Sequence, residues 1–285
     1  GFYDKPGIKV VILYPKGKVS DLQERQLTTL GKNIEAIEIE GTFDDCQAMV
    51  KKAFLDEELN SLGLTSANSI NVARWLPQML YYFYAYQELK SKNKPIVISV
   101  PSGNFGNIGA AVVAQKMGLP IQKLIASTNS NDTIPRFYQK GIYQPTPTIP
   151  TLSNAMDVSE PSNFVRILEL YEGLENSKMQ FNSLSFDENQ TKMGLKELWN
   201  EYHYLADPHG AVGYMGLKSE MNSNPECLGV FLETAHPTKF APAIETILEV
   251  SPETPESMKP LFETPIRKHM MKDYNEVKTF LTHLW

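Results

Sequence analysis

The sequence has few of the features that mark secreted, membrane-spanning or nucleic-acid-binding proteins. Only two of its 285 residues are cysteine, Cys46 and Cys227, and their unrelated surroundings predict buried free thiols in a reducing compartment. No apolar run approaches the ~18 residues that a membrane-spanning helix needs, and no signal peptide is apparent. The net charge of −6 argues against a basic surface for nucleic acid. We therefore expect a cytoplasmic protein with no membrane or nucleic-acid partner.

Metal ligands in a recognisable spacing are also lacking. The five histidines are not spaced for metal binding with one another or with the cysteines, so we predict no metal site. His209 lies in a turn with Asp207 and Pro208, before a helix of small residues that suggests close backbone packing, and we interpret it as structural. The composition, 42% hydrophobic and 21% charged, is ordinary for a globular protein, and the length suffices for one large or two smaller domains.

The most informative stretch is residues 95–118, where an apolar run leads through a Gly-rich turn into a helix. Residues 96–100 predict a buried parallel strand, and Gly103, Gly106 and Gly109 follow it. The first turn of a helix has unpaired N–H groups, and glycines let an anion such as phosphate approach them. Spacing alone does not decide between a ligand site and a plain tight turn. The turn lacks the Gly-Lys-Ser/Thr ending of a P-loop and the Gly-x-Gly-x-x-Gly spacing of dinucleotide sites.

The first part of the chain predicts a small parallel sheet. Strands and helices are expected to alternate there, at residues 8–14, 20–31, 34–39 and 42–59. We expect residues 1–62 to be part of a smaller α/β domain and residues 63–285 to form a larger one. Each domain is predicted to be an open parallel sheet flanked by helices.

A polar segment, residues 63–74, precedes a long apolar helix that ends near residue 91. The many aromatic residues of this helix predict that it is buried, and Pro77 is expected to kink it or to mark its first turn. Helix capping explains one of Asn68 and Ser69. Arg74 needs an anionic partner on so apolar a helix, either an acidic side chain or a substrate phosphate, and spacing alone favours the acid.

The rest of the chain is expected to continue the larger domain. Further elements are predicted as strands at residues 123–127 and 227–232, and as helices at 134–140, 162–175, 191–205, 238–249 and 274–284. The polar turn 129–133 lies at the end of a strand, where open α/β sheets bind ligands, but simple helix capping is the favoured explanation. Thr234 lies at the corresponding end of the last strand.

Three stretches, read together and in this order, resemble threonine synthase, a member of the pyridoxal-phosphate enzymes of the tryptophan-synthase-β fold type. They are Ser-Ala-Asn-Ser-Ile-Asn-x-x-Arg at residues 66–74, Ser-Gly-Asn-Phe-Gly-Asn at 102–107 and Glu-Thr-Ala-His-Pro at 233–237. The opening Gly1-Phe2-Tyr3 and the turn at Asp207 also resemble that family. The similarity extends over essentially the whole chain, and the ordered combination is much more specific than any single motif.

This resemblance implies pyridoxal 5′-phosphate as the cofactor and the α/β architecture of fold type II. It assigns the cofactor phosphate to five consecutive residues, Gly103, Asn104, Phe105, Gly106 and Asn107. It also places the hydroxyl of Thr234 at the pyridine nitrogen. A hydroxyl, unlike a carboxylate, need not keep that nitrogen protonated, so the ring is then a weaker electron sink.

The resemblance further implies a lyase of threonine biosynthesis, which converts O-phospho-L-homoserine and water into L-threonine and phosphate by a β,γ-replacement. It assigns the substrate phosphate to Asn68, Ser69 and Arg74, and for Arg74 it reverses the preference for an acidic partner. Electrostatic binding of the departing phosphate would then be a large contribution to catalysis.

The sequence departs from the family in lacking its Schiff-base lysine. No lysine stands in a Phe-Lys-Asp type context, and Lys239, the nearest in form, follows Thr234 in the wrong place. The chain also begins with Gly1 rather than Met. We therefore expect the lysine upstream, in a remaining N-terminal part of the same enzyme, and we expect this chain to be inactive alone. A natural relative without the lysine is the less favoured alternative.

Other functions fit part of the pattern. An amino-alcohol phospholyase of the same fold type also acts on a phosphorylated substrate, whereas a threonine dehydratase would leave the Asn68–Arg74 segment without a purpose. A metabolite-binding protein without catalysis would need only the Gly-rich turn.

Overall fold

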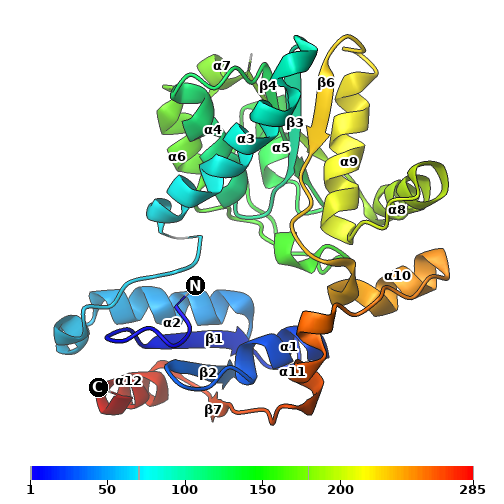
Figure 1. Cartoon of the computed structure of the whole chain (residues 1–285). Coiled ribbons are helices and arrows are strands. Elements are labelled where there is room, and N and C mark those ends of the chain that lie inside the picture. The colour runs from blue at the N-terminus through cyan, green and yellow to red at the C-terminus, as the bar shows by residue number, and fades with distance from the viewer. Residues whose placement is uncertain (1, 70, 179, 285) are drawn as a thin grey trace. The chain divides into compact units, whose positions relative to one another are not determined.

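The computed structural model describes residues 2–69, 71–178 and 180–284, and it divides the chain into two compact units. Unit 1 consists of Gly1–Ser66 and Glu253–Trp285, and unit 2 consists of Ala67–Pro252. Each contains a parallel sheet with helices around it (Figure 1), which confirms the predicted α/β class. Gly1 and Ile70, which belong to two of the motifs that resemble the family, lie outside the described residues.

Unit 1 is built on a three-stranded sheet in the order β1-β2-β7. Its strands are β1 (Val10–Pro15), β2 (Ile34–Ile39) and β7 (His269–Met271). Its helices are α1 (Asp21–Thr28), α2 (Phe43–Leu55), α11 (Pro260–Glu263) and α12 (Tyr274–Leu284), with short 3-10 turns at η1 (Glu57–Leu62) and η6 (Glu256–Met258). The predicted alternation of strands and helices is confirmed, and α1 and α2 both begin with a capping box.

The C-terminal residues belong to unit 1, although the sequence analysis assigned them to the larger domain. β7 pairs with β2 in parallel, with His269 opposite Ile37. Met271 and Val277 are buried together with Ile37 and Ile39 in one apolar cluster. A three-residue strand and a pairing across more than two hundred residues leave no local pattern in the sequence, so the predicted boundary at residue 63 missed this return of the chain.

Unit 2 is built on a four-stranded parallel sheet in the order β5-β4-β3-β6. The strands are β3 (Ile96–Pro101), β4 (Lys123–Thr128), β5 (Phe181–Ser185) and β6 (Leu228–Phe231). β3 is buried along its whole length, as predicted for a central strand. Because the strands are parallel, their carboxyl ends meet at one edge, and the turns that follow β3, β4 and β6 lie there.

Helices cover both faces of this sheet (Figure 1). One face carries α3 (Trp75–Leu89), α4 (Gly106–Lys116), α5 (Thr133–Lys140) and α6 (Phe164–Leu170). The other carries α9 (Pro208–Met221), which packs against α8 (Glu188–Tyr202). The remaining elements of the unit are α7 (Leu174–Ser177), α10 (Ala241–Leu248), η2 (Val72–Arg74), η3 (Lys90–Lys92), η4 (Asn154–Met156) and η5 (Pro237–Phe240). None of the described helices is long and apolar enough to cross a membrane.

Helix α9 approaches the sheet closely, as its small residues predicted. The hydroxyl of Ser99 in β3 donates a hydrogen bond to the carbonyl oxygen of Gly213 at 2.6 Å. A Cβ atom at Gly216 would overlap the Ser127 hydroxyl and lie 2.9 Å from that of Ser99. Glycine at these positions therefore lets the helix backbone rest on the strands.

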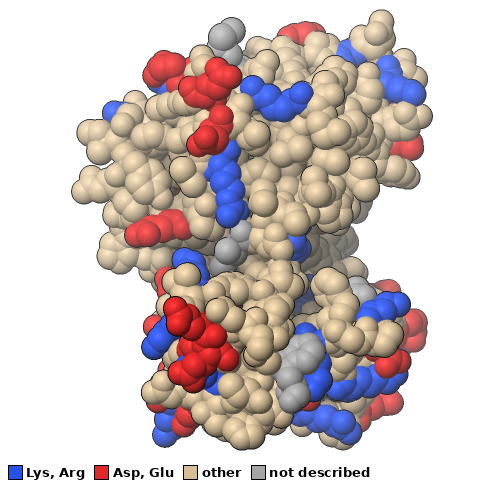
Figure 2. All heavy atoms as spheres, turned by 90° about the vertical axis from the view of Figure 1, so that its left-hand side faces the viewer, with Lys and Arg blue, Asp and Glu red and all other residues tan. Residues whose placement is uncertain are grey.

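Helix α3 differs from the prediction in its start and in its exposure. It begins after η2, where the side chain of Asn71 accepts a hydrogen bond from the Ala73 N–H, so the cap is neither Asn68 nor Ser69. Pro77 lies in the first turn, as expected. The helix is buried only in part: Trp75 and Tyr82 are buried, but large apolar side chains are exposed at Leu76, Leu80, Tyr81 and Tyr84. Figure 2 views the side of unit 2 on which α3 lies and shows a broad surface with few charged residues.

Candidate active site

The Gly-rich turn joins the end of β3 to the start of α4. Phe105 is the residue before the helix, and its φ of 61° places it in the left-handed region, which a bulky residue rarely adopts. Its ring is buried and packs edge-on against Phe164, with the ring centroids 5.6 Å apart. No side chain of the described residues caps α4, and the N–H groups of its first turn have no partner within the helix. Such a helix start attracts an anion, and it fits the phosphate of a cofactor.

The three glycines of this stretch serve different purposes. A Cβ atom at Gly103 would lie 2.6 Å from Cα of Met156, and one at Gly109 would lie 2.5 Å from the indole ring of Trp75. Packing alone therefore accounts for these two glycines, although the resemblance assigned Gly103 to the cofactor phosphate and spacing alone had left a ligand site and a plain tight turn open. A Cβ atom at Gly106 would lie 3.4 Å from Cβ of Ser69, so this glycine faces the described residues of the segment at 67–74 at an ordinary contact distance.

The structure brings the predicted cofactor residues and the predicted substrate residues together. The side-chain amide of Asn104 donates to the Ser69 hydroxyl at 2.7 Å. Asn163, at the start of α6, donates from its amide to the carbonyl oxygens of both Ser69 and Asn104, each at 2.9 Å. Asn163 is completely buried. The sequence analysis did not identify Asn163 as a site residue. Its one signal in the sequence is an asparagine directly before the apolar start of a helix.

Asn104 is held from a second direction. Its side-chain oxygen accepts hydrogen bonds from the N–H of Ser162 at 2.7 Å and from the hydroxyl of the same residue at 3.0 Å. Both ends of the Asn104 amide therefore bind protein groups, so its side chain shapes the turn. Arg166 in turn donates to the Asn163 oxygen at 2.7 Å.

Arg74 ends the 3-10 turn η2 and is exposed. One of its guanidinium nitrogens donates to the carbonyl oxygen of Ala67 at 2.6 Å. Within the part of the chain that the structure describes, it forms no ion pair with an acidic side chain, so the acidic partner that spacing favoured is not found. Asn68 lies before this turn, and its carbonyl oxygen accepts from the N–H of Asn71 at 3.2 Å.

Asn107, in the first turn of α4, is fixed by Tyr82 of α3. The hydroxyl of Tyr82 donates to the side-chain oxygen of Asn107 at 2.8 Å. Burial raises the pKa of Tyr82 well above its usual value, so the hydroxyl stays protonated and remains a donor. The contact ties the start of α4 to the neighbouring helix.

Thr234 lies at the same edge of the unit 2 sheet as the Gly-rich turn. β6 is a parallel neighbour of β3, and the N–H of Leu232 continues their pairing by donating to the carbonyl oxygen of Ser99 at 3.1 Å. Thr234 follows two residues later and is exposed.

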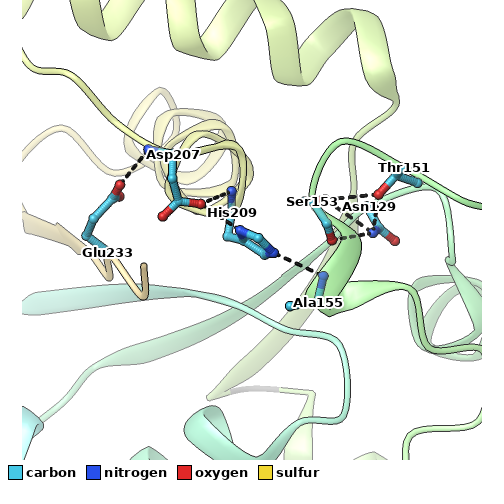
Figure 3. A network of polar contacts seen from close by, with 7 residues as sticks. All are labelled: Asn129, Thr151, Ser153, Ala155, Asp207, His209 and Glu233. Carbon is cyan, nitrogen blue, oxygen red and sulfur yellow. Dashed lines mark hydrogen bonds and ion pairs between the residues drawn. The ribbon is translucent and has the colours of Figure 1, made fainter. Parts of the chain in front are cut away.

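A polar network lies beneath this edge (Figure 3). The carboxylate of Asp207 accepts from both the backbone N–H and the ring Nδ1 of His209, each at 2.6 Å. The N–H of Asp207 donates to the carboxyl of Glu233 at 2.7 Å, and the N–H of Ala155 donates to Nε2 of His209 at 3.2 Å. Both ring nitrogens of His209 thus have partners, which supports its interpretation as a structural residue.

The polar turn after β4 was expected to cap α5. It holds the loop at residues 149–157 instead. Among the residues that the structure describes, no side chain caps α5. The amide of Asn129 donates to the hydroxyl of Thr151 at 2.8 Å and to the carboxylate of Asp157 at 2.9 Å (Figure 3 shows the first). The loop includes Met156, which lies against Gly103, so these bonds also support the Gly-rich turn.

Known proteins resemble this chain over nearly its whole length. A family model described as "Pyridoxal-phosphate dependent enzyme" matches residues 4–228, and one described as "Threonine synthase, C-terminal" matches residues 210–281. Threonine synthase of Buchnera aphidicola subsp. Schizaphis graminum is 48% identical over 98% of the chain. The crystal structure of threonine synthase from Escherichia coli matches with a TM-score of 0.92, at 44% identity over 100% of the chain. The pyridoxal-phosphate-bound threonine synthase from Brucella melitensis matches with a TM-score of 0.88, at 32% identity over 99%.

These proteins are longer than the chain. It spans 65% of the Buchnera protein, 66% of the E. coli structure and 67% of the Brucella structure. The resemblance that the three sequence motifs indicated is therefore confirmed, over about two thirds of the relatives' length.

Proposed function

This chain belongs to the family of pyridoxal-phosphate-dependent enzymes, and we propose that it is part of a threonine synthase, which converts O-phospho-L-homoserine and water into L-threonine and phosphate. The observation that carries the proposal is the pair of hydrogen bonds by which Asn163 joins two segments of the chain. This one buried amide binds the backbone of both Ser69 and Asn104. This contact supports the proposal that a substrate phosphate and a cofactor phosphate bind side by side in unit 2.

We propose that the turn from Gly103 to Asn107 holds the cofactor phosphate through the N–H groups of the first turn of α4. The uncapped helix start and the left-handed backbone at Phe105 support this assignment. When bound, pyridoxal phosphate supplies an electron sink for the electron pairs that are left as protons leave the substrate. Thr234, at the same edge of the sheet, would offer its hydroxyl to the pyridine nitrogen without requiring that nitrogen to be protonated.

Asn68, Ser69 and Arg74 would hold the phosphate of the substrate. A guanidinium has five N–H donors, and one guanidinium nitrogen of Arg74 donates to the carbonyl oxygen of Ala67, which fixes the direction of the side chain. The remaining donors can bind phosphate oxygens as a fork, which is a stronger contact than one with a neutral group. Because negative charge grows on this group as it departs, such contacts stabilise the transition state more than the bound substrate.

The Schiff-base lysine would lie in the remaining part of the enzyme. None of the motifs found in the chain contains it, and about one third of the length of the relatives lies outside the matched region. We therefore propose that the complete enzyme, rather than this chain alone, carries the activity.

Arg74→Ala in the complete enzyme tests the substrate site. Loss of a charge-assisted contact of about 1.5–3 kcal/mol should raise KM for O-phospho-L-homoserine roughly 10- to 150-fold. Inhibition by inorganic phosphate should weaken in parallel. Arg267→Ala, which removes an exposed arginine of unit 1, is the matched control and should leave both quantities unchanged. An unchanged KM and phosphate inhibition in Arg74→Ala would contradict the assignment.

A further inference from the structure

Two carboxyl groups meet inside unit 2 without a basic partner. Asp207, immediately before α9, is completely buried, and Glu233 follows β6 by two residues. One oxygen of each, Oδ2 of Asp207 and Oε2 of Glu233, is buried without a hydrogen-bond partner. Within residues 2–69, 71–178 and 180–284, neither carboxyl forms an ion pair with a lysine or arginine. Two negative charges at this place would be strongly unfavourable.

Glycine at position 210 makes room for this arrangement. A Cβ atom at Gly210 would overlap Oε2 of Glu233 and would lie 2.7 Å from Oε1. The carboxyl of Glu233 therefore lies across the first turn of α9, over a residue that has no side chain. The N–H of Asp207 holds it there.

His209 does not neutralise the pair. Its Nε2 accepts a hydrogen bond from the N–H of Ala155, so this nitrogen carries no proton. The ring proton is then on Nδ1, which donates it to Asp207, and the imidazole is neutral. The proton that lowers the charge of the two carboxyls must come from elsewhere.

We propose that Asp207 and Glu233 share one proton, and that this acid pair is a positioning group for Thr234. Asp207 already accepts two hydrogen bonds from His209, which stabilise its ionised form, so the shared proton resides on Glu233. Glu233 precedes Thr234 directly, and its bond to Asp207 ties the end of β6 to α9 (Figure 3). When the proton is lost, repulsion between the carboxyls displaces Glu233 and the threonine beside it.

The surroundings of the pair support the shared proton. Burial first, and then the charge of Asp207, raise the pKa of Glu233 to about 8 from an ordinary value of 4.5. Two other titratable groups face the pair, Tyr204 and His209. The pKa of Tyr204 is raised by burial first and then by the charges of Glu233 and Asp207, and Asp157 lies beyond His209. A carboxyl whose pKa is raised by folding stabilises the protein below its unfolded value, near pH 4.5. That stabilisation is lost as the pH rises through about 8.

The test is Glu233→Gln in the complete enzyme, since glutamine copies the protonated acid and cannot ionise. Denaturant unfolding is measured from pH 5 to pH 9 without cofactor or substrate. The wild type should lose stability relative to Glu233→Gln as the pH rises, whereas Glu175→Gln, an exposed control on α7, should follow the wild type. Parallel profiles for wild type and Glu233→Gln would overturn the shared proton.

A second readout tests the positioning of Thr234, whose part in cofactor binding rests on the proposed function. The affinity for pyridoxal phosphate is measured by absorbance titration over the same pH range. Wild-type affinity should fall at least tenfold more than that of Glu233→Gln between pH 7 and pH 9. Equal changes would overturn the positioning group but not the shared proton. The unfolding profiles do not depend on the reaction, so a failure to form threonine would leave them intact.

A compensated pair of variants keeps the inference testable if Glu233→Gln fails to fold. Gly210→Ala alone should displace Glu233 and destabilise the enzyme. Adding Glu233→Gly should restore stability, because it removes the overlapping carboxyl, and it should also abolish the loss of stability between pH 5 and about pH 8 that the acid pair causes. If Gly210→Ala is as stable as the wild type, Glu233 does not occupy this place and the inference is overturned.

Discussion

Replacement of Gly109 by alanine tests how the Gly-rich turn is built. The new Cβ atom would lie 2.5, 2.7 and 2.8 Å from three carbons of the Trp75 indole, where ordinary contacts are 3.4–4 Å. Trp75 is only 3% exposed, so its ring cannot move aside without disturbing the core of unit 2. Because Trp75 follows Arg74 directly, a displaced indole also moves the proposed phosphate ligand.

The expected magnitude follows from two opposing effects. Alanine in a helix interior is favoured over glycine by about 1 kcal/mol. Overpacking of a rigid core typically costs about 1–3 kcal/mol, and a clash of this depth with a buried ring belongs at the upper end of that range. We therefore expect a net loss of about 1–2 kcal/mol in the free energy of unfolding, together with a higher KM for O-phospho-L-homoserine.

Denaturant unfolding followed by circular dichroism measures this loss, and Gly194→Ala is the matched control. Gly194 is also inside a helix, but its added Cβ atom would meet the flexible side chain of Met215 at 3.0 Å and the carbonyl oxygen of Ala211 at 3.2 Å, so that variant should lose less stability than Gly109→Ala. Trp75→Phe should make Gly109→Ala less costly by about 1 kcal/mol, since it removes part of the obstructing ring. If Gly109→Ala and Gly194→Ala are equally stable, Trp75 does not constrain the turn.

Two further substitutions probe the contact between the turn and the segment at residues 67–74. Gly106→Ala should change stability by less than about 1 kcal/mol, because its Cβ atom would lie 3.4 Å from that of Ser69. The added methyl group narrows the space beside Ser69, so KM for O-phospho-L-homoserine should rise. An unchanged KM in steady-state kinetics would argue against a substrate at Ser69. Asn163→Ala leaves the carbonyl oxygens of Ser69 and Asn104 without their donor. It should lower the free energy of unfolding by about 1–3 kcal/mol, as measured by denaturant unfolding, and weaken cofactor binding, as measured by absorbance titration. Asn60→Ala, at an exposed position, is its control. Equal stability and equal cofactor affinity of the two variants would refute the proposal that Asn163 joins the two segments.

The sequence was sufficient to predict the elements whose signals are local. The β-branched run, the glycines and the helical spacing between residues 95 and 118 predicted β3, the turn and α4, because each signal lies within a few residues of the element it specifies. β5 was missed because three of its five residues are polar and do not alternate with apolar ones, and β7 was missed because it has only three residues, so both depend on pairing with other strands. The exposure of α3 was missed because aromatic content does not by itself show which face of a helix is covered.

The site could be located by its motifs but could not be assembled from them. Asn163 joins Ser69 and Asn104 across 94 and 59 positions of the chain, and Glu233 meets Asp207 across 26. Such contacts depend on where the folded strands and helices end, which spacing does not record. The same holds for Gly103 and Gly109, whose packing partners come from a distant loop and from α3.

The central claim is that this chain belongs to a threonine synthase with adjoining sites for a cofactor phosphate and a substrate phosphate. The most direct test is to supply the complete enzyme with pyridoxal phosphate and O-phospho-L-homoserine and to measure both products. Equal amounts of L-threonine and inorganic phosphate are predicted. Phosphate accompanied by a keto acid and no threonine, or no phosphate at all, would contradict the account.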